Sequence, residues 1–100
     1  MGASSGFADA VLELVDAVPP GRVVTYGDVA TLLGRPPVAA RAVGRVMATA
    51  GGEVCWWRVV TARGDLAPHL IAVAREHWRR EATPLLPDGR VDVPRARWDG

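Results

Sequence analysis

The sequence has 100 residues, 49% of them hydrophobic and 23% charged, and this composition excludes disordered, collagen-like and fibrous proteins. A chain of this length forms one compact domain, so we expect a single domain over residues 1–100. No apolar run approaches the roughly 18 residues that span a membrane, so no membrane partner is expected. The net charge of +1 does not by itself indicate a nucleic-acid partner.

The one cysteine, Cys55, has no second cysteine with which to form an internal disulfide, which is compatible with a reducing cytoplasm. The first six residues lack a basic segment followed by an apolar stretch, so we expect no signal peptide. We therefore expect a cytoplasmic protein, and we expect it to be a monomer.

The first predicted helix extends from Gly6 to Val18, because its apolar residues recur at helical spacing. Asp9 lies in its first turn, where the helix dipole favours a negative charge. The turn Pro19-Pro20-Gly21 ends it. This helix has three acidic residues and no basic one, whereas the segment from Arg22 to Thr49 has four arginines and one acid, Asp28. The local surplus of +3 can face phosphate while the whole chain stays nearly neutral.

A helix-turn-helix is predicted within this basic segment. Thr25 and Asp28 have the spacing of a capping box, which predicts a second helix from about Tyr26 to Leu33. After two prolines, a third helix is predicted from Val38 to about Thr49, with a small-residue surface and two arginines. Two short helices joined by a tight turn are typical of DNA-binding motifs. An ordinary pair of packed helices with solvated arginines is the alternative.

The second half of the chain is predicted to add one strand and one helix. The segment from Val54 to Val60 is dense in β-forming residues and predicts a mostly buried strand, and a last helix is predicted from Pro68 to about Ala82. The tail is rich in loop residues, but Val91, Val93 and Trp98 give it apolar surface with which to fold back. The predicted fold class is mainly α with a short β element, a winged-helix-like helix-turn-helix DNA-binding domain.

The sequence offers no arrangement for catalysis or metal binding. A nucleophile needs a base within reach, and neither His69 nor His77 lies beside Cys55 in the sequence. One cysteine and two histidines eight residues apart do not form a zinc site. We therefore expect no catalytic residue, no metal and no cofactor, and we expect both histidines to be structural.

Four short motifs carry more specific information. They are Pro20-Gly21-Arg22-Val23-Val24-Thr25-Tyr26-Gly27-Asp28-Val29-Ala30, Gly34-Arg35-Pro36, Ala40-Arg41-Ala42-Val43-Gly44-Arg45 and Arg58-Val59-Val60. With them, the stretch from Val11 to Val60 resembles the DNA-binding domain of the alkylguanine-DNA alkyltransferases. The resemblance covers half of the chain and implies the fold of that domain, with double-stranded DNA as the partner.

In that family the active-site strand has the sequence Pro-Cys-His-Arg-Val, in which the cysteine accepts the alkyl group with help from the histidine. Alignment on Arg58-Val59 places Cys55 at the proline, Trp56 at the cysteine and Trp57 at the histidine. A tryptophan at the nucleophile position is what the alkyltransferase-like proteins have, so the chain resembles this subgroup of the family. The resemblance implies binding of DNA with alkylated guanine without repair, and transfer of the lesion to nucleotide excision repair proteins.

The resemblance also assigns the binding residues. Arg41 would enter the duplex through the minor groove in place of the extruded nucleotide, and Tyr26 would crowd the backbone phosphate. Arg45 and the backbone N–H groups near Ala42 and Gly44 would contact phosphate. The lesion pocket would be lined by Trp56, Trp57 and Arg58.

Two departures from the family pattern bear on the pocket. Trp57 replaces a histidine that is usually retained, and Glu81, which matches a glutamate that orients this histidine, is expected to lack its usual partner. On the predicted strand, Cys55 is one position from Trp56 and would point to the opposite face. Two other functions stay open: an alkyltransferase that uses Cys55, and a protein-interaction module that has lost DNA binding.

Overall fold

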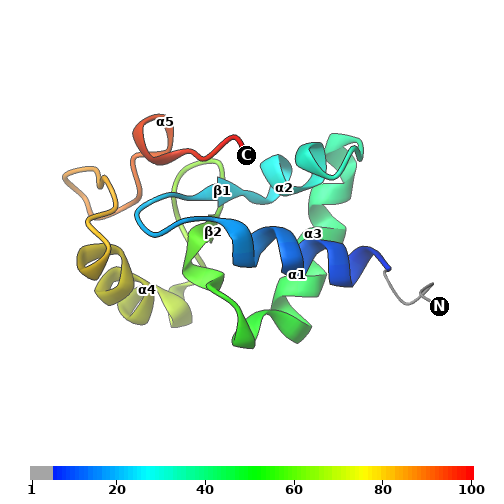
Figure 1. Cartoon of the computed structure of the whole chain (residues 1–100). Helices are drawn as coiled ribbons and strands as arrows, with labels where there is room; N and C mark the ends of the chain where they lie inside the picture. The colour runs from blue at the N-terminus through cyan, green and yellow to red at the C-terminus, as the bar shows by residue number, and fades with distance from the viewer. Residues whose placement is uncertain (1–5) are drawn as a thin grey trace.

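Helices make up most of the computed structural model, which describes residues 6–100, and two short strands lie between them (Figure 1). The α-helices are α1 (Phe7–Ala17), α2 (Tyr26–Leu32), α3 (Ala40–Ala50), α4 (Pro68–Arg80) and α5 (Val93–Ala96). The strands are β1 (Val24–Thr25) and β2 (Val59–Val60), and the 3₁₀ helices are η2 (Pro37–Ala39), η3 (Gly51–Glu53) and η4 (Trp56–Arg58). The predicted fold class, mainly α with a short β element, is confirmed.

No helix within residues 6–100 combines the length and the apolar character that crossing a bilayer requires. The start of the chain, for which no signal peptide is expected, lies outside the described residues.

The capping box predicted at Thr25 fixes the start of α2. The backbone N–H of Asp28 donates to Oγ1 of Thr25 at 3.0 Å, and the N–H of Thr25 donates to Oδ2 of Asp28 at 3.0 Å. These reciprocal bonds satisfy two backbone donors that have no partner inside the helix. As a result α2 begins at Tyr26, as predicted, and it ends at Leu32, one residue before the predicted end.

The helices α2 and α3 form the predicted helix-turn-helix, with η2 in the turn between them. Pro37 is the first residue of η2, where its missing N–H and fixed φ are tolerated. The regular helix α3 therefore begins at Ala40, two residues after the predicted start at Val38, and ends at Ala50. Val43 is fully buried and joins α3 to the core that α1 and α2 share.

The two strands separate two apolar cores. They pair in parallel, with Val24 opposite Val59 and Thr25 opposite Val60. Because successive residues of an extended chain point to opposite faces, Val24 and Val59 join the core formed with α1, α2 and α3. Val23 and Val60 join the second core, against α4 and the C-terminal segment, residues 91–100. Figure 1 shows this division, with the strands between α1 to α3 on one side and α4 and α5 on the other.

The predicted strand from Val54 to Val60 is wrong except for its last two residues, which form β2. The chain bends at Cys55, whose φ of −75° and ψ of 66° are those of an inverse γ-turn, closed by a hydrogen bond of 2.7 Å. In η4, which follows, the backbone carbonyl of Trp57 accepts a hydrogen bond of 2.7 Å from the indole of Trp78 in α4. Contacts with α4 therefore outweigh the β-propensity of this segment.

The C-terminal segment folds back onto the body, as predicted. Val91 and Ala96 are fully buried. The N–H of Val23 donates to the carbonyl of Ala96 at 3.0 Å, and the N–H of Trp98 donates to the carbonyl of Val23 at 2.8 Å. The segment therefore lies beside the start of β1, and it contains the short helix α5, which the sequence did not indicate.

The C-terminal segment packs directly against the turn after β2, where the N–H of Val91 donates to the carbonyl of Gly64 at 2.9 Å. The φ of Gly64 is +82°, and a Cβ there would collide with the backbone oxygen of Val91. We predict that Gly64→Ala lowers the free energy of unfolding by about 3 kcal/mol or more, because left-handed strain and a backbone clash add. Unfolding in urea measures this loss. Gly52→Ala is the matched control, since a Cβ there meets nothing within 4 Å. Equal stabilities of the two variants would contradict this role of Gly64.

Candidate functional site

A pocket of about 370 Å³ lies between the end of α3 and the start of α4. Its aromatic walls are Tyr26, the first residue of α2, and Trp56, the first residue of η4. The other lining residues are small or apolar except for one histidine: Gly44, Met47, Ala48, Gly51, Gly52, Leu66, Ala67, His69 and Leu70. Residues 6–100 hold no cluster of metal-ligating side chains. The pocket therefore suits a flat, largely apolar ring.

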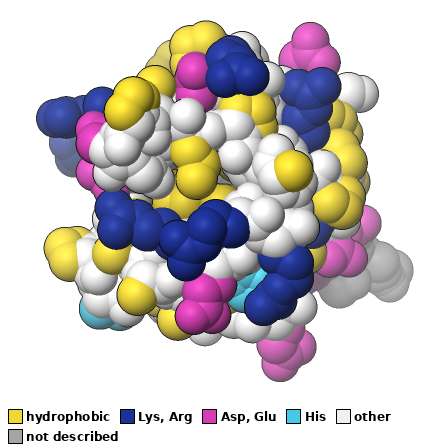
Figure 2. Space-filling view, turned by 90° about the vertical axis from the view of Figure 1, so that its left-hand side faces the viewer, with side chains coloured by type: hydrophobic (Ala, Val, Ile, Leu, Met, Phe, Trp, Pro, Cys, Tyr) yellow, Lys and Arg dark blue, Asp and Glu magenta, His cyan; other side chains and the backbone are white. Residues whose placement is uncertain are grey.

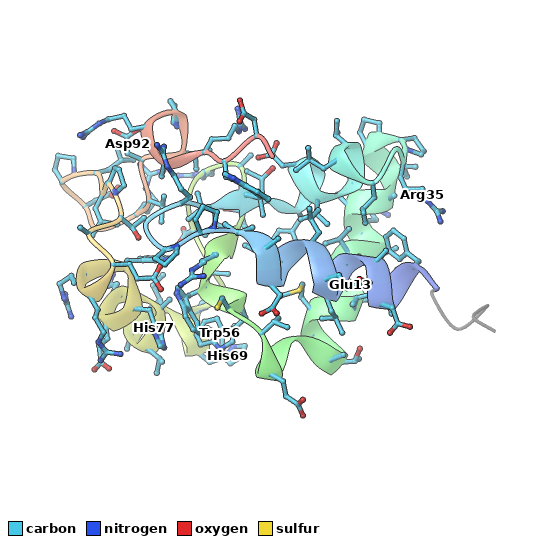
Figure 3. All side chains as sticks on the ribbon, in the orientation of Figure 1. Glu13, Arg35, Trp56, His69, His77 and Asp92 are labelled. Atoms are coloured by element: carbon cyan, nitrogen blue, oxygen red, sulfur yellow. The ribbon has the colours of Figure 1, made fainter. Side chains whose placement is uncertain are left out.

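Trp56 lies in the pocket wall, whereas the adjacent Cys55 is not a lining residue. The Trp56 ring packs edge-on against the rings of Trp57 and His77, with centroids 5.6 Å and 6.2 Å away. Figure 3 shows Trp56, His69 and His77 on the same side of the molecule, beside α4. Because Cys55 and Trp56 lie in a turn and a 3₁₀ helix, strand alternation is not what separates Cys55 from the pocket.

Trp57 packs against Trp56 but does not itself line the pocket. Its ring stacks on His77 of α4, with centroids 3.6 Å apart and planes 7° from parallel. Its indole N–H donates to Oε2 of Glu81 at 2.9 Å. Glu81 was expected to lack its usual histidine partner, and the structure shows that the indole of Trp57 supplies a donor to it instead.

Arg58 is also outside the pocket lining, because its side chain forms a buried ion pair with Glu81. The two side chains are 11% and 12% exposed. Nε and Nη2 of Arg58 donate to the two carboxylate oxygens of Glu81, and Nη1 donates to the carbonyl of Val18 at 2.8 Å. Of the three residues expected in the pocket, the structure thus brings Trp56 to its wall and places Trp57 and Arg58 in a network that joins α1, η4 and α4.

Arg41 lies on the side of α3 that faces the pocket. Gly44 and Ala48 line the pocket, and residues three or four apart share a helix face, so Arg41 lies one turn before them. Arg41 and Arg45 are exposed, and neither belongs to a salt bridge among the described residues. Their guanidinium groups are therefore free to contact an anionic partner such as phosphate.

Ala42 and Gly44, both expected to offer backbone N–H groups, differ in their positions along α3. Ala42 lies in the first turn, where N–H groups lack partners from the same helix. Gly44 lies in the second turn, where the helix itself uses the N–H. Gly44 therefore contributes to the pocket wall rather than a free donor.

Tyr26 directly follows Thr25, the N-cap residue of the capping box, so the start of α2 sets its place in the pocket wall. Burial raises the pKa of its phenol, so the hydroxyl is neutral at physiological pH. Asp28, the one acid between Arg22 and Thr49, accepts a hydrogen bond of 3.0 Å from Nε of Arg97. The positive charge of the helix-turn-helix is therefore not offset by a free carboxylate of its own.

Comparison with known proteins assigns the chain to a family. Residues 6–83 match the profile described as "6-O-methylguanine DNA methyltransferase, DNA binding domain". A DNA base-flipping protein of Escherichia coli (strain K12) is 38% identical over 98 residues, which cover 93% of this chain and 74% of the relative. The chain belongs to this family, as an alkyltransferase-like protein.

Two solved structures resemble the alkyltransferase-like chain over most of its length. The crystal structure of S. pombe Atl1 in complex with damaged DNA containing O6-carboxymethylguanine has a TM-score of 0.78 and 26% identity, and the match covers 94% of this chain and 95% of that chain. A crystal structure of S. pombe ATL in complex with DNA has a TM-score of 0.76 and 27% identity over the same shares. The likeness therefore extends beyond the residues that the family profile matches.

The sequence of this alkyltransferase-like protein did not indicate that the start of α4 forms part of the pocket wall. Leu66, Ala67, His69 and Leu70 belong to none of the matching motifs, and His69 was expected to be structural. Only the fold brings this segment to α3, so no local signal in the sequence marks it.

The stabilisation that the network beside the pocket provides depends on pH through the ionisation of Glu81. Burial by itself raises the pKa of the carboxyl, but hydrogen bonds from Arg58, Trp57 and Gly21 together lower it below its usual value. In the unfolded chain the pKa of a glutamate is about 4.3. Because the folded-state pKa is lower, the stabilisation is complete above the unfolded value and is lost as the pH falls through the folded value.

We predict that Glu81→Ala lowers the free energy of unfolding at neutral pH by about 3 kcal/mol, because the charge of Arg58 is left buried without its partner. The difference from the parent should shrink in acid, where the parent carboxylate is protonated. Unfolding in urea across this pH range measures both effects. Asp88→Ala is the matched control, since its ion pair with Arg90 is exposed and such pairs contribute little. Parent-like stability of Glu81→Ala would rule out this role for the network.

Proposed function

We propose that this protein binds duplex DNA that carries O6-alkylguanine and holds the extruded base in the pocket without transferring its alkyl group. The observation that carries the proposal is the composition of the pocket wall, which includes Trp56 and not Cys55. An indole offers a flat surface on which a base can stack. It has no thiolate to accept an alkyl group. Binding of the lesion can therefore persist where the transfer chemistry is lost.

The arginines of α3 support DNA as the partner. Arg41 and Arg45 are exposed on the helix that lines the pocket, and the relatives named above include a base-flipping protein and a protein bound to damaged DNA. We infer that Arg41 enters the duplex through the minor groove and takes the place of the extruded nucleotide. Arg45 and the backbone N–H of Ala42 then contact phosphate and set the register.

Selection of the lesion follows from the cost of extrusion. Taking a base out of the stack costs a few kcal/mol, and less when alkylation has already weakened its pairing. Tyr26 crowds the phosphate of the nucleotide that leaves the stack, and Trp56 packs against the base that arrives in the pocket. Alkylated guanine is therefore bound more tightly than guanine.

Without transfer, the alkyl carbon keeps its bond to O6 of the guanine, because the pocket lining offers no thiolate to attack it. Another system then has to remove the damaged nucleotide. Within this proposal the protein marks the lesion for nucleotide excision repair proteins, as the family resemblance implies.

Binding to matched duplexes tests the proposal. We predict that the protein binds a duplex with O6-methylguanine at least about tenfold more tightly than the unmodified duplex, and that Arg41→Ala removes about 1.4 kcal/mol or more of this binding. Fluorescence anisotropy measures both affinities. Equal affinities for the two duplexes, or no binding to either, would refute the proposal, and parent-like binding by Arg41→Ala would remove the insertion role.

A control arginine is needed because positive charge is not confined to α3. Figure 2 shows arginine side chains spread over the end of the molecule that carries α4 and α5. Arg79 is exposed and follows His69 by ten residues of α4, a distance of about 15 Å along the helix. We expect Arg79→Ala to keep the preference for the lesion, so the comparison separates insertion by Arg41 from general attraction to phosphate.

Intact mass distinguishes binding from transfer by Cys55. We predict that the mass of the protein is unchanged after incubation with DNA that contains O6-methylguanine, and that Cys55→Ala keeps the affinity of the parent for the lesion. A single methyl adduct on Cys55 would show that the protein is an alkyltransferase. A protein-interaction module would show no change in any measured activity in Arg41→Ala.

A further inference from the structure

The C-terminal segment reaches the same capping box that positions Tyr26. Nε of Arg97 donates to Oδ2 of Asp28 at 3.0 Å, and this oxygen also accepts the backbone N–H of Thr25 at 3.0 Å. Tyr26 follows Thr25 directly and is the first residue of α2. One carboxylate oxygen therefore joins Arg97 to the residue that precedes Tyr26.

The backbone on both sides of Arg97 is fixed. The carbonyl of Ala96 accepts the N–H of Val23 at 3.0 Å, and the N–H of Trp98 donates to the carbonyl of Val23 at 2.8 Å. Arg97 thus forms a parallel bridge with Val23, the residue before β1. The guanidinium therefore reaches Asp28 from a backbone that is itself bound to the body of the protein.

The same segment continues along α2. Trp98 packs against the core that α1, α2 and α3 share. Gly100 lies next to Leu32, the last residue of α2, while Asp28 is in the first turn of this helix. The C-terminal segment therefore contacts α2 near both of its ends. It lies outside residues 6–83, which the profile of the DNA-binding domain matches.

We propose that Arg97 is a positioning residue that acts through Asp28 to hold Tyr26 in the pocket wall. This inference rests on the proposed function, in which Tyr26 takes part in extruding the base. Arg97 restrains the side chain of Asp28 and with it the cap from which α2 starts. It also neutralises a carboxylate that would otherwise repel phosphate close to Tyr26.

The exposure of the pair argues against a mainly stabilising role. The side chain of Arg97 is 49% exposed and that of Asp28 is 24% exposed. Ion pairs with this much access to water contribute little to the stability of the whole protein. The effect of the pair therefore comes from its place at the cap beside Tyr26.

Nuclear magnetic resonance on the DNA-free protein tests the positioning directly, because the chain has a single tyrosine and so one set of tyrosine ring signals. We predict that Arg97→Ala shifts the signals of Tyr26. Arg97→Lys should return them toward the parent positions, since an ammonium group can still pair with Asp28. Arg95→Ala is the control, because its side chain is 70% exposed, and it should leave the signals in place. Unchanged signals in Arg97→Ala overturn the proposal whether or not the protein binds DNA.

A double-mutant cycle on lesion binding tests whether Arg97 acts through Tyr26. We predict that Arg97→Ala lowers the ratio of affinities for the O6-methylguanine duplex and the unmodified duplex by about threefold or more, and that it has no further effect when Tyr26→Ala is present. Equal effects of Arg97→Ala in the two backgrounds would overturn the proposal. If the parent binds both duplexes equally, the proposed function fails, and the ring signals of Tyr26 still decide on the positioning.

Discussion

The hydrogen bond from the indole of Trp57 to Glu81 determines which of two neighbouring tryptophans faces the pocket. Glu81 is itself held by Arg58 in a pair that is almost fully buried, so the acceptor has a fixed place. The stack of Trp57 on His77 then sets the orientation of η4 against α4. Because Trp57 is bound in this network, Trp56 is the tryptophan that lines the pocket wall. A buried polar network whose members are all satisfied is rigid, and here the rigidity defines the shape of the pocket.

The short parallel sheet connects this network to the helix-turn-helix. The strand β1 leads directly into the capping box and Tyr26, and β2 follows directly after η4 and Trp56. Because Val24 pairs with Val59, the two aromatic walls of the pocket are placed by one pair of strands. The C-terminal segment adds Arg97 to the outer side of the same cap. The pocket and the basic face of α3 therefore depend on a few backbone pairings in the middle of the molecule.

Patterns among residues that are close in the sequence made part of the fold predictable. The capping box joins residues three positions apart, so the start of α2 at Tyr26 follows from the sequence alone. The strand expected from Val54 failed because η4 is bound by α4, which is distant in the sequence. The ion pair of Arg58 joins residues 23 positions apart, so no local pattern in the sequence could indicate it. Because this pair keeps Arg58 out of the pocket lining, the prediction that Arg58 lines the pocket failed. That Trp56 stands at the nucleophile position rests on alignment to a single motif, Arg58-Val59, and stays a prediction.

The most direct test is a crystal structure of the protein with a duplex that contains O6-methylguanine. We predict that the alkylated base leaves the stack and packs against Trp56, with the side chain of Arg41 in the gap that it vacates and the sulfur of Cys55 out of contact with the methyl group. A methyl group that faces Cys55 within reach of its sulfur, or a base that stays in the stack, would contradict this reading of the pocket.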